Sequence, residues 1–250
     1  MLGWRLARLV VHLLQGLLTC ALVFPWAGAA LRERMVRRWS GRLLGICRVR
    51  VERVPGVDAL AHALIVANHI SWLDIFVINS MLPCRFVAKA EIRAWPVVGW
   101  LVAQAGTVFI ARGNRRELRH IFKGLVDALA GRQRVAFFPE GTTAAQGQLL
   151  PFHANLFEAA IDAGVPVQPY ALSYLNARGG WHAAVDYTGD TTFGDSILRI
   201  LGGEPILARL ESLAPIAAGK GTHRRELAKE AQAAIEAAPS RRSRESGNPY

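Results

Sequence analysis

Apolar and polar positions divide the chain into an apolar N-terminal arm, a long middle with alternating patterns and a polar tail. Residues 9–31 are apolar apart from a few small or polar positions, a length that can span about 30 Å of hydrocarbon, and Pro25 is expected to break this run. Over residues 29–46, arginines alternate with Leu, Met, Val and Trp, which is typical of a helix at a membrane interface. We therefore predict membrane-anchoring helices in residues 1–47.

Between residues 48 and 220, short apolar runs alternate with segments that have the helical period. The predicted strands cover residues 48–54, 63–67, 85–88, 107–110, 134–138, 165–172, 183–187 and 204–210. The predicted helices cover residues 72–81, 95–103, 115–130, 155–163 and 192–201. This order predicts an α/β fold, a mixed sheet flanked by helices.

The C-terminal end carries one more helical pattern and a polar extension. Residues 221–238 predict a closing amphipathic helix. Residues 239–250, rich in Arg and Ser, bury too little apolar surface to offset the entropy of ordering, so we expect a disordered tail. A chain of 250 residues fits one α/β domain, which we place at residues 48–220.

The net charge of +11 is concentrated near the N-terminus, because residues 1–53 hold ten Arg against two acidic residues. A basic arm beside a neutral middle suits an anionic membrane surface, and neither a stacking platform nor a basic groove for nucleic acid is evident. Bases flank the apolar run on both sides, which favours a hairpin or an in-plane anchor. A cleaved signal peptide, with a new N-terminus near Ala30, stays open as an alternative.

His69 is the first candidate for chemistry, since it follows a predicted strand and precedes a predicted helix, where side chains face ligands. A reaction at a hydroxyl needs a base to accept its proton, and histidine suits that role. If the helix begins only after Ser71, Asp74 can reach His69 and hold its tautomer. Alternatively, Ser71 and Asp74 form a capping box and Asp74 merely satisfies a backbone N–H.

Two further clusters follow later strands. Residues 106–112 run from Gly106 to Arg112, a strand whose terminal Arg can bind a phosphate or can simply be a surface residue. Residues 137–143, Phe-Phe-Pro-Glu-Gly-Thr-Thr, break a strand and expose polar groups. There Glu140 could orient an acceptor headgroup or a neighbouring base and Thr142 could hydrogen-bond the acceptor, although an ordinary turn explains the pattern equally well.

These blocks, together with Val165-Pro-Val-Gln-Pro169, resemble in type and order the glycerolipid acyltransferase family typified by 1-acylglycerol-3-phosphate acyltransferase. The resemblance covers residues 54–172. It implies that His69 is the general base and Asp74 its partner. It also implies a set of substrate-binding residues, namely Lys89, Gly106, Arg112, Glu140, Gly141 and Thr142.

The family resemblance further implies an acyl-CoA or acyl carrier protein donor, no cofactor or metal, and an enzyme on the cytoplasmic face of a bacterial-type inner membrane. The implied reaction acylates a lysolipid, 1-acylglycerol-3-phosphate, to form phosphatidic acid. Two departures thin the positive charge near the site: Thr143 stands where relatives often have Arg, and His153-Ala154 replaces a Lys or Arg followed by Gly. A lyso-aminolipid such as lyso-ornithine lipid is therefore an alternative acceptor.

Other classes of protein fit the residues less well. A non-catalytic membrane-binding protein would not need both His69 and Asp74. A serine hydrolase would need a Gly-x-Ser-x-Gly elbow, which is missing from the sequence. A metallohydrolase would need more ligands than His62, His69 and Asp74 supply. Three scattered cysteines predict a reducing compartment and no structural zinc.

Overall fold

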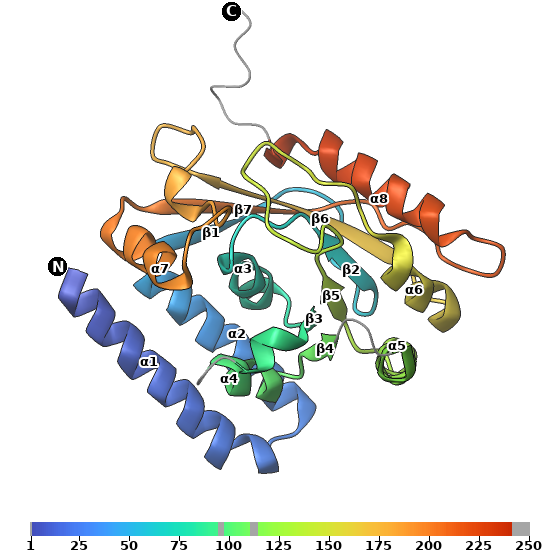
Figure 1. Cartoon of the computed structure of the whole chain (residues 1–250), viewed down its shortest axis with the longest axis horizontal. Coiled ribbons are helices and arrows are strands. Elements are labelled where there is room, and N and C mark those ends of the chain that lie inside the picture. Colours follow the sequence, from blue (N-terminus) through green and yellow to red (C-terminus); the bar gives the residue numbers. More distant parts are fainter. Residues whose placement is uncertain (1, 95–97, 111–114, 242–250) are drawn as a thin grey trace, which may run out of the picture.

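The computed structural model describes residues 2–94, 98–110 and 115–241; the side chains of Lys89, Val98 and residues 115–121 are outside this description. A seven-stranded sheet in the order β1-β7-β6-β2-β5-β3-β4 forms its centre (Figure 1). The strands are β1 Val49–Val54, β2 Leu64–Ala67, β3 Arg85–Lys89, β4 Val108–Ile110, β5 Val135–Phe137, β6 Val167–Leu175 and β7 Ile206–Ser212.

Neighbouring strands run parallel except for β6 and β7, which are antiparallel, so the predicted mixed sheet is confirmed. The central strands β2 and β6 are buried along their whole length. This burial explains why they read as unbroken apolar runs rather than as alternating patterns. Because β2, β5, β3 and β4 run parallel, their carboxyl ends meet at one edge of the sheet.

Helices cover both faces of the sheet (Figure 1). One core cluster joins the sheet to α2, α3 and α7, and a second joins it to α5, α6 and α8. The helices are α1 Leu2–Leu22, α2 Ala29–Ile46, α3 Leu73–Met81, α4 Val98–Gln104, α5 Arg115–Ala130, α6 Glu158–Ala163, α7 Phe193–Gly202 and α8 Arg224–Ala237.

The N-terminal arm is a helical hairpin, as the break at Pro25 predicts. Helix α1 ends before the short 3-10 helix η1, Phe24–Trp26, and α2 then returns along α1. His12 and Trp39 lock the two helices together: their rings stack at 4.6 Å, Trp39 donates its indole N–H to the His12 carbonyl, and His12 Nε2 bonds the Trp39 carbonyl. Gly16 makes this approach possible, because a Cβ there would lie 2.7 Å from Trp39 Nε1.

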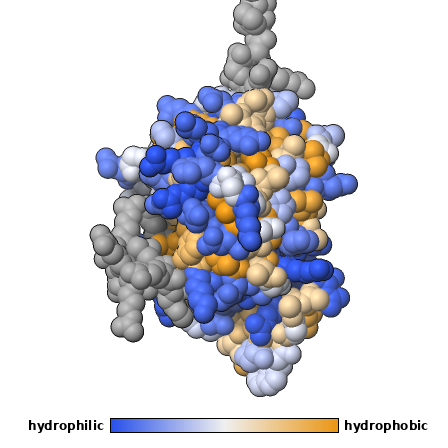
Figure 2. Space-filling view, turned by 90° about the vertical axis from the view of Figure 1, so that its right-hand side faces the viewer, coloured by the Kyte–Doolittle hydropathy of each residue, from blue (hydrophilic) through white to orange (hydrophobic). Residues whose placement is uncertain are grey.

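Large hydrophobic side chains that remain exposed are concentrated on this arm. Ten of the fourteen such residues in the described structure belong to it, including Trp4, Val11 and Trp26. Within the described residues, α1 is also the one helix long and apolar enough to cross a membrane. Figure 2 shows another face of the molecule, on which hydrophilic side chains surround separate apolar patches.

Two local expectations are wrong. Residues 183–187, expected as a strand, contain the 3-10 helix η4, Ala183–Val185. The tail is ordered over its first three residues, because Pro239–Arg241 form the 3-10 helix η5, in which Ser240 N–H bonds Glu211 and the Arg241 guanidinium bonds the Gln148 carbonyl. Residues 242–250 lie outside the described structure.

Candidate active site

The turn between β2 and α3 begins with a side-chain bridge to the neighbouring strand. Asn68, the residue after β2, donates to the Leu172 carbonyl at 3.0 Å and accepts from the Leu172 N–H at 2.8 Å. The amide thus replaces one rung of the β2–β6 ladder at the point where the chain leaves the sheet. The buried bridge fixes the direction in which the next residue, His69, projects.

His69 and Asp74 are brought together, as their spacing predicts. His69 Nδ1 lies 2.7 Å from Asp74 Oδ2, and α3 begins only at Leu73, so the five-residue interval is not a continuous helix. Asp74 is completely buried, whereas the His69 side chain is 19% exposed. Because a carboxylate can only accept, Nδ1 carries the proton and Nε2 is left as the basic nitrogen.

The capping alternative for Asp74 is also realised, by the same oxygen. Asp74 Oδ2 accepts from the backbone N–H groups of Ile70 at 2.7 Å and Ser71 at 3.0 Å. The carboxylate therefore shapes the turn and holds the imidazole at once. Ser71 itself is completely buried, which leaves it unable to act as the exposed nucleophile of a serine hydrolase.

Tyr174, on β6, completes the surroundings of Asp74. Its hydroxyl donates to Asp74 Oδ1 at 2.6 Å, whereas His69 meets the other carboxylate oxygen, Oδ2. Burial raises the pKa of Tyr174 well above its ordinary value, and the adjacent Asp74 raises it further, so the phenol stays protonated. Sequence patterns could not find this residue, since it lies within an apolar strand a hundred positions from Asp74.

One face of the imidazole is covered by an aromatic ring. Phe138, the first residue after β5, stacks on His69 with centroids 3.9 Å apart and an interplanar angle of 6°. Phe86 packs behind it at 5.8 Å. The stack restricts rotation of the His69 ring and keeps water from that face, so substrate can approach only from the other directions.

Glu140 binds the backbone of His69 and of a later loop residue. Its Oε1 accepts from the His69 N–H at 2.8 Å, and its Oε2 accepts from the Leu150 N–H at 2.8 Å. The side chain is only 4% exposed, and burial raises the pKa of this carboxyl although the two backbone bonds lower it. Of the two roles expected for Glu140, orienting the base has direct geometric support.

The rest of this loop also meets His69. The Ala144 N–H donates to the His69 carbonyl at 2.8 Å, so both backbone polar groups of His69 are bonded to the loop. Gly141 has a φ of 69°, and a Cβ there would lie 3.3 Å from the His153 ring, which is why glycine suits the position. Thr142 is exposed, whereas the Thr143 hydroxyl bonds the Tyr187 carbonyl.

The other predicted substrate-binding residues lie along the same sheet edge or outside the description. Gly106 precedes β4 with a φ of 86°. Lys89 ends β3 and pairs with Ile110 at the end of β4, although its side chain is not described. Arg112 lies outside the described residues, so the expectation that it binds the acceptor headgroup stays a prediction. Carboxyl ends of parallel strands are where α/β sheets bind ligands.

An apolar cavity of about 160 Å³ lies between the arm and the domain, beside α3. Its wall includes Leu13, Gly16 and Leu43 from the arm and Trp72 and Phe76 from α3. Trp72 starts only three residues after His69, and its indole N–H bonds Ser196 on α7. Phe86 also lines the cavity, and it packs against Phe138, the ring that stacks on His69.

No group of three or more metal-ligating side chains occurs in the part of the chain that the structure describes. The surface histidine His62 is exposed and separate from His69. The site offers an imidazole backed by a buried carboxylate.

Comparison with known proteins agrees with this geometry. The family model described as Acyltransferase matches residues 48–173. A lyso-ornithine lipid O-acyltransferase of Pseudomonas aeruginosa is 40% identical over 82% of this chain and 78% of its own length. A 1-acyl-sn-glycerol-3-phosphate acyltransferase of Neisseria meningitidis is 41% identical over 59% of this chain and 58% of its own length.

The fold matches a solved structure as well. The 1-acyl-sn-glycerophosphate acyltransferase of Thermotoga maritima superposes with a TM-score of 0.63 over 94% of this chain and 95% of that chain, at 20% identity. The chain belongs to the acyltransferase family, and it is an enzyme of that class. The resemblance inferred from the sequence blocks is thereby confirmed.

Proposed function

We propose that this enzyme transfers a fatty acyl group from a thioester donor, acyl-CoA or acyl carrier protein, to the free hydroxyl of 1-acylglycerol-3-phosphate. The observation that carries the proposal is the pairing of His69 with the buried Asp74, which leaves Nε2 as the basic atom of a partly exposed imidazole. Relatives named for both lysolipid-acylating activities are 40% and 41% identical to this chain over the matched segments.

In the proposed reaction, His69 Nε2 accepts the proton of the acceptor hydroxyl while the oxygen attacks the thioester carbonyl carbon. The tetrahedral intermediate collapses, the carbon–sulfur bond breaks, and the thiolate takes the proton from the imidazolium. Asp74 stabilises that imidazolium between the two steps. Such general-base assistance contributes roughly 10²–10⁴ in rate.

The apolar cavity beside α3 suits the acyl chain. It is lined almost wholly by apolar side chains, and burial of each methylene is worth about 0.8 kcal/mol. The chain would lie between the arm and α3, with its carbonyl toward His69.

The arm is proposed to lie in the leaflet on the cytoplasmic face. Its exposed apolar side chains, with Trp4 near one end of the hairpin and Trp26 at its turn, match an in-plane interfacial anchor. Soluble thioester donors are present on the cytoplasmic side, so this placement brings donor and lipid acceptor together.

Lyso-ornithine lipid is a second candidate acceptor, favoured by two observations. Thr143 removes a guanidinium that would suit a phosphate, and its hydroxyl is occupied by the Tyr187 carbonyl. The long overlap with the Pseudomonas relative points the same way.

The test is acyl transfer by the purified protein with each donor and each acceptor offered separately. Wild-type product that His69→Ala lacks, with His62→Ala as a matched control on an exposed histidine, supports the mechanism; normal turnover by folded His69→Ala would remove it. Product from 1-acylglycerol-3-phosphate supports the first acceptor, and product from lyso-ornithine lipid alone replaces it with the second.

A further inference from the structure

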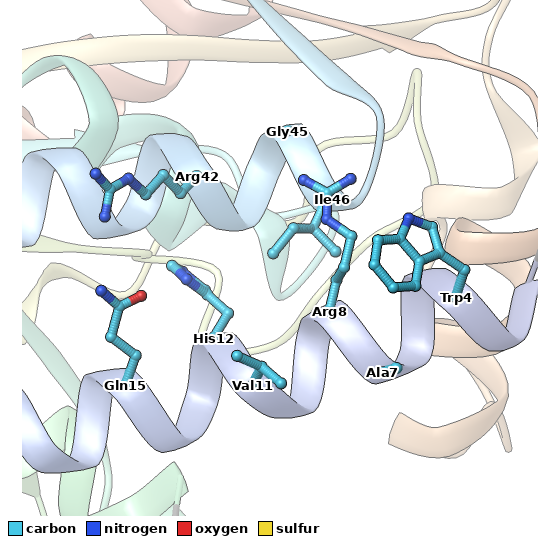
Figure 3. A pocket seen from close by; sticks show the side chains of 9 residues that line it. All are labelled: Trp4, Ala7, Arg8, Val11, His12, Gln15, Arg42, Gly45 and Ile46. Carbon is cyan, nitrogen blue, oxygen red and sulfur yellow. The ribbon is translucent and has the colours of Figure 1, made fainter.

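A second hollow lies on the arm itself, between α1 and α2, and shares no residue with the acyl cavity or the site around His69. Its volume is about 590 Å³. Figure 3 shows the side chains that surround it: Trp4, Ala7, Arg8, Val11, His12, Gln15, Arg42, Gly45 and Ile46.

Two guanidinium groups line this groove, and neither has an acidic partner among the described residues. Arg8 rises from α1 toward the end of α2, while Arg42 extends along α2 above Gln15 (Figure 3). Neither arginine forms an ion pair or hydrogen bond with any residue that the structure describes, and no acidic side chain lines the groove. An anion entering it would meet two positive charges and no repulsion.

The floor of the groove is rigid. His12 is buried and held by Trp39, so its ring is a fixed surface rather than a mobile donor. Burial lowers the pKa of His12, and the charge of Arg42 contributes to that effect, which places the Arg42 guanidinium within electrostatic reach of the floor. The groove is thus formed before any ligand arrives, which reduces the entropic cost of binding.

The surroundings of the groove indicate which anion fits. Trp4 is 70% exposed and Val11 is 64% exposed, and they continue into the outward apolar face of α1. A ligand bound by the arginines therefore has apolar protein surface beside it rather than a polar rim. A phosphate attached to acyl chains matches both features, whereas a free phosphate matches only the first.

We propose that the groove between α1 and α2 binds the phosphodiester headgroup of an anionic phospholipid of the bilayer, with Arg8 and Arg42 contacting the phosphate region. The bound lipid is neither donor nor acceptor. It fixes how deeply the arm lies in the leaflet, and so sets the height of His69 above the lipid. The inference rests on the membrane attachment within the proposed function but not on the reaction.

Binding of phosphatidylglycerol and phosphatidylcholine to the full-length protein in detergent, without acyl donor, tests the proposal by native mass spectrometry. Wild type should retain phosphatidylglycerol selectively. Arg8→Gln with Arg42→Gln should weaken that binding by about tenfold or more, because two charge-assisted contacts are lost. Arg34→Gln with Arg37→Gln removes the same charge from exposed positions outside the groove and should change binding less than threefold.

A second pair of variants inserts charge instead of removing it. Gly45 lines the groove and Gly41 does not, yet a Cβ at either position meets no atom within 4 Å. Gly45→Asp should therefore abolish selective phosphatidylglycerol binding, while Gly41→Asp should preserve it. The two variants share the same helix and the same change in charge, so a general loss of folding would affect both.

Three results would overturn the proposal: equal binding of both lipids by wild type, equal losses in groove and control variants, or displacement of the lipid by millimolar inorganic phosphate. His69→Ala should bind phosphatidylglycerol as wild type does. A chain without acyltransferase activity that still binds the lipid would leave the groove standing and remove the proposed reaction; an active enzyme without selective binding would do the reverse.

Discussion

The phenol of Tyr174 donates to Asp74 at 2.6 Å while His69 occupies the other carboxylate oxygen. The Asp74 carboxylate thus accepts four hydrogen bonds, two from side chains and two from backbone N–H groups, while remaining completely buried. A buried carboxylate needs such compensation to stay ionised. The orientation of His69 therefore depends on this hydrogen-bond network.

Tyr174→Phe should lower kcat about tenfold, since a hydrogen bond to a charged group is worth about 1.5–3 kcal/mol and part of that supports the imidazolium. The KM for the donor should stay within about twofold. Tyr170→Phe is the matched control, because Tyr170 is on the same strand and its buried hydroxyl has no hydrogen-bond partner among the described residues. Equal kcat for the two variants would contradict a positioning role.

Glu140→Gln should destabilise the fold by about 1–3 kcal/mol and reduce turnover. Both carboxylate oxygens accept from backbone N–H groups, and an amide can replace only one of them, leaving its NH₂ facing a donor. Chemical denaturation measures the loss. Glu158→Gln, which removes an exposed partner of Arg224, should cost less than about 1 kcal/mol.

The stability gap between wild type and Glu140→Gln should depend on pH. Because burial raises the pKa of Glu140 above 4.5, the folded protein holds this proton more tightly than the unfolded chain does. Its contribution to stability is therefore greatest below pH 4.5 and declines as pH rises through the raised pKa. Denaturation series at several pH values should show that the difference in unfolding free energy between the two proteins decreases as the pH rises. A difference that stays constant with pH would contradict the burial argument.

Gly16→Ala should loosen the arm although alanine favours helix. Its Cβ would lie 2.7 Å from Trp39 Nε1, so the His12–Trp39 lock must shift. Gly41→Ala meets open space and should stabilise α2 by about 0.5–1 kcal/mol. Thermal unfolding should move down for the first variant and up for the second, and two upward shifts would show that the lock tolerates displacement.

Ala105→Phe should shift donor preference toward shorter acyl chains, because Ala105 lines the apolar cavity and a larger side chain occupies its volume. Competition between donors of different chain length measures the change, with turnover on short donors retained. Ala30→Phe, at an exposed position of α2 outside the cavity, should leave the preference unchanged. An unaltered preference in both would place the acyl chain elsewhere.

The pairing of His69 with Asp74 could be predicted from sequence because it is local: five residues and a late helix start decide it. Tyr174 could not, since its partner comes from pairing of β6 with β2, which no single run of residues specifies. Glu140 was recognised by its motif, but the direction of its carboxylate depends on the His69 and Leu150 backbones.

The fold divides in the same way. Strand and helix periods predict the elements, whereas the change of strand direction between β6 and β7 follows from long-range pairing. Residues 183–187 do not form the expected strand, because the Tyr187 N–H bonds the Ile70 carbonyl and not a neighbouring strand. The ordered end at Ser240 depends on Glu211, a contact that a polar composition conceals.

The acyl cavity is walled by the arm on one side and by α3 and α4 on the other, while the base is fixed by the sheet and the loop after β5. In the proposed binding mode, substitutions in the hairpin would therefore change the acyl-chain preference without touching the residues that perform the chemistry. Transplanting residues 1–47 between relatives would carry the chain-length preference with it. The arm that we propose as the membrane anchor would thus also set which acyl chains the enzyme transfers.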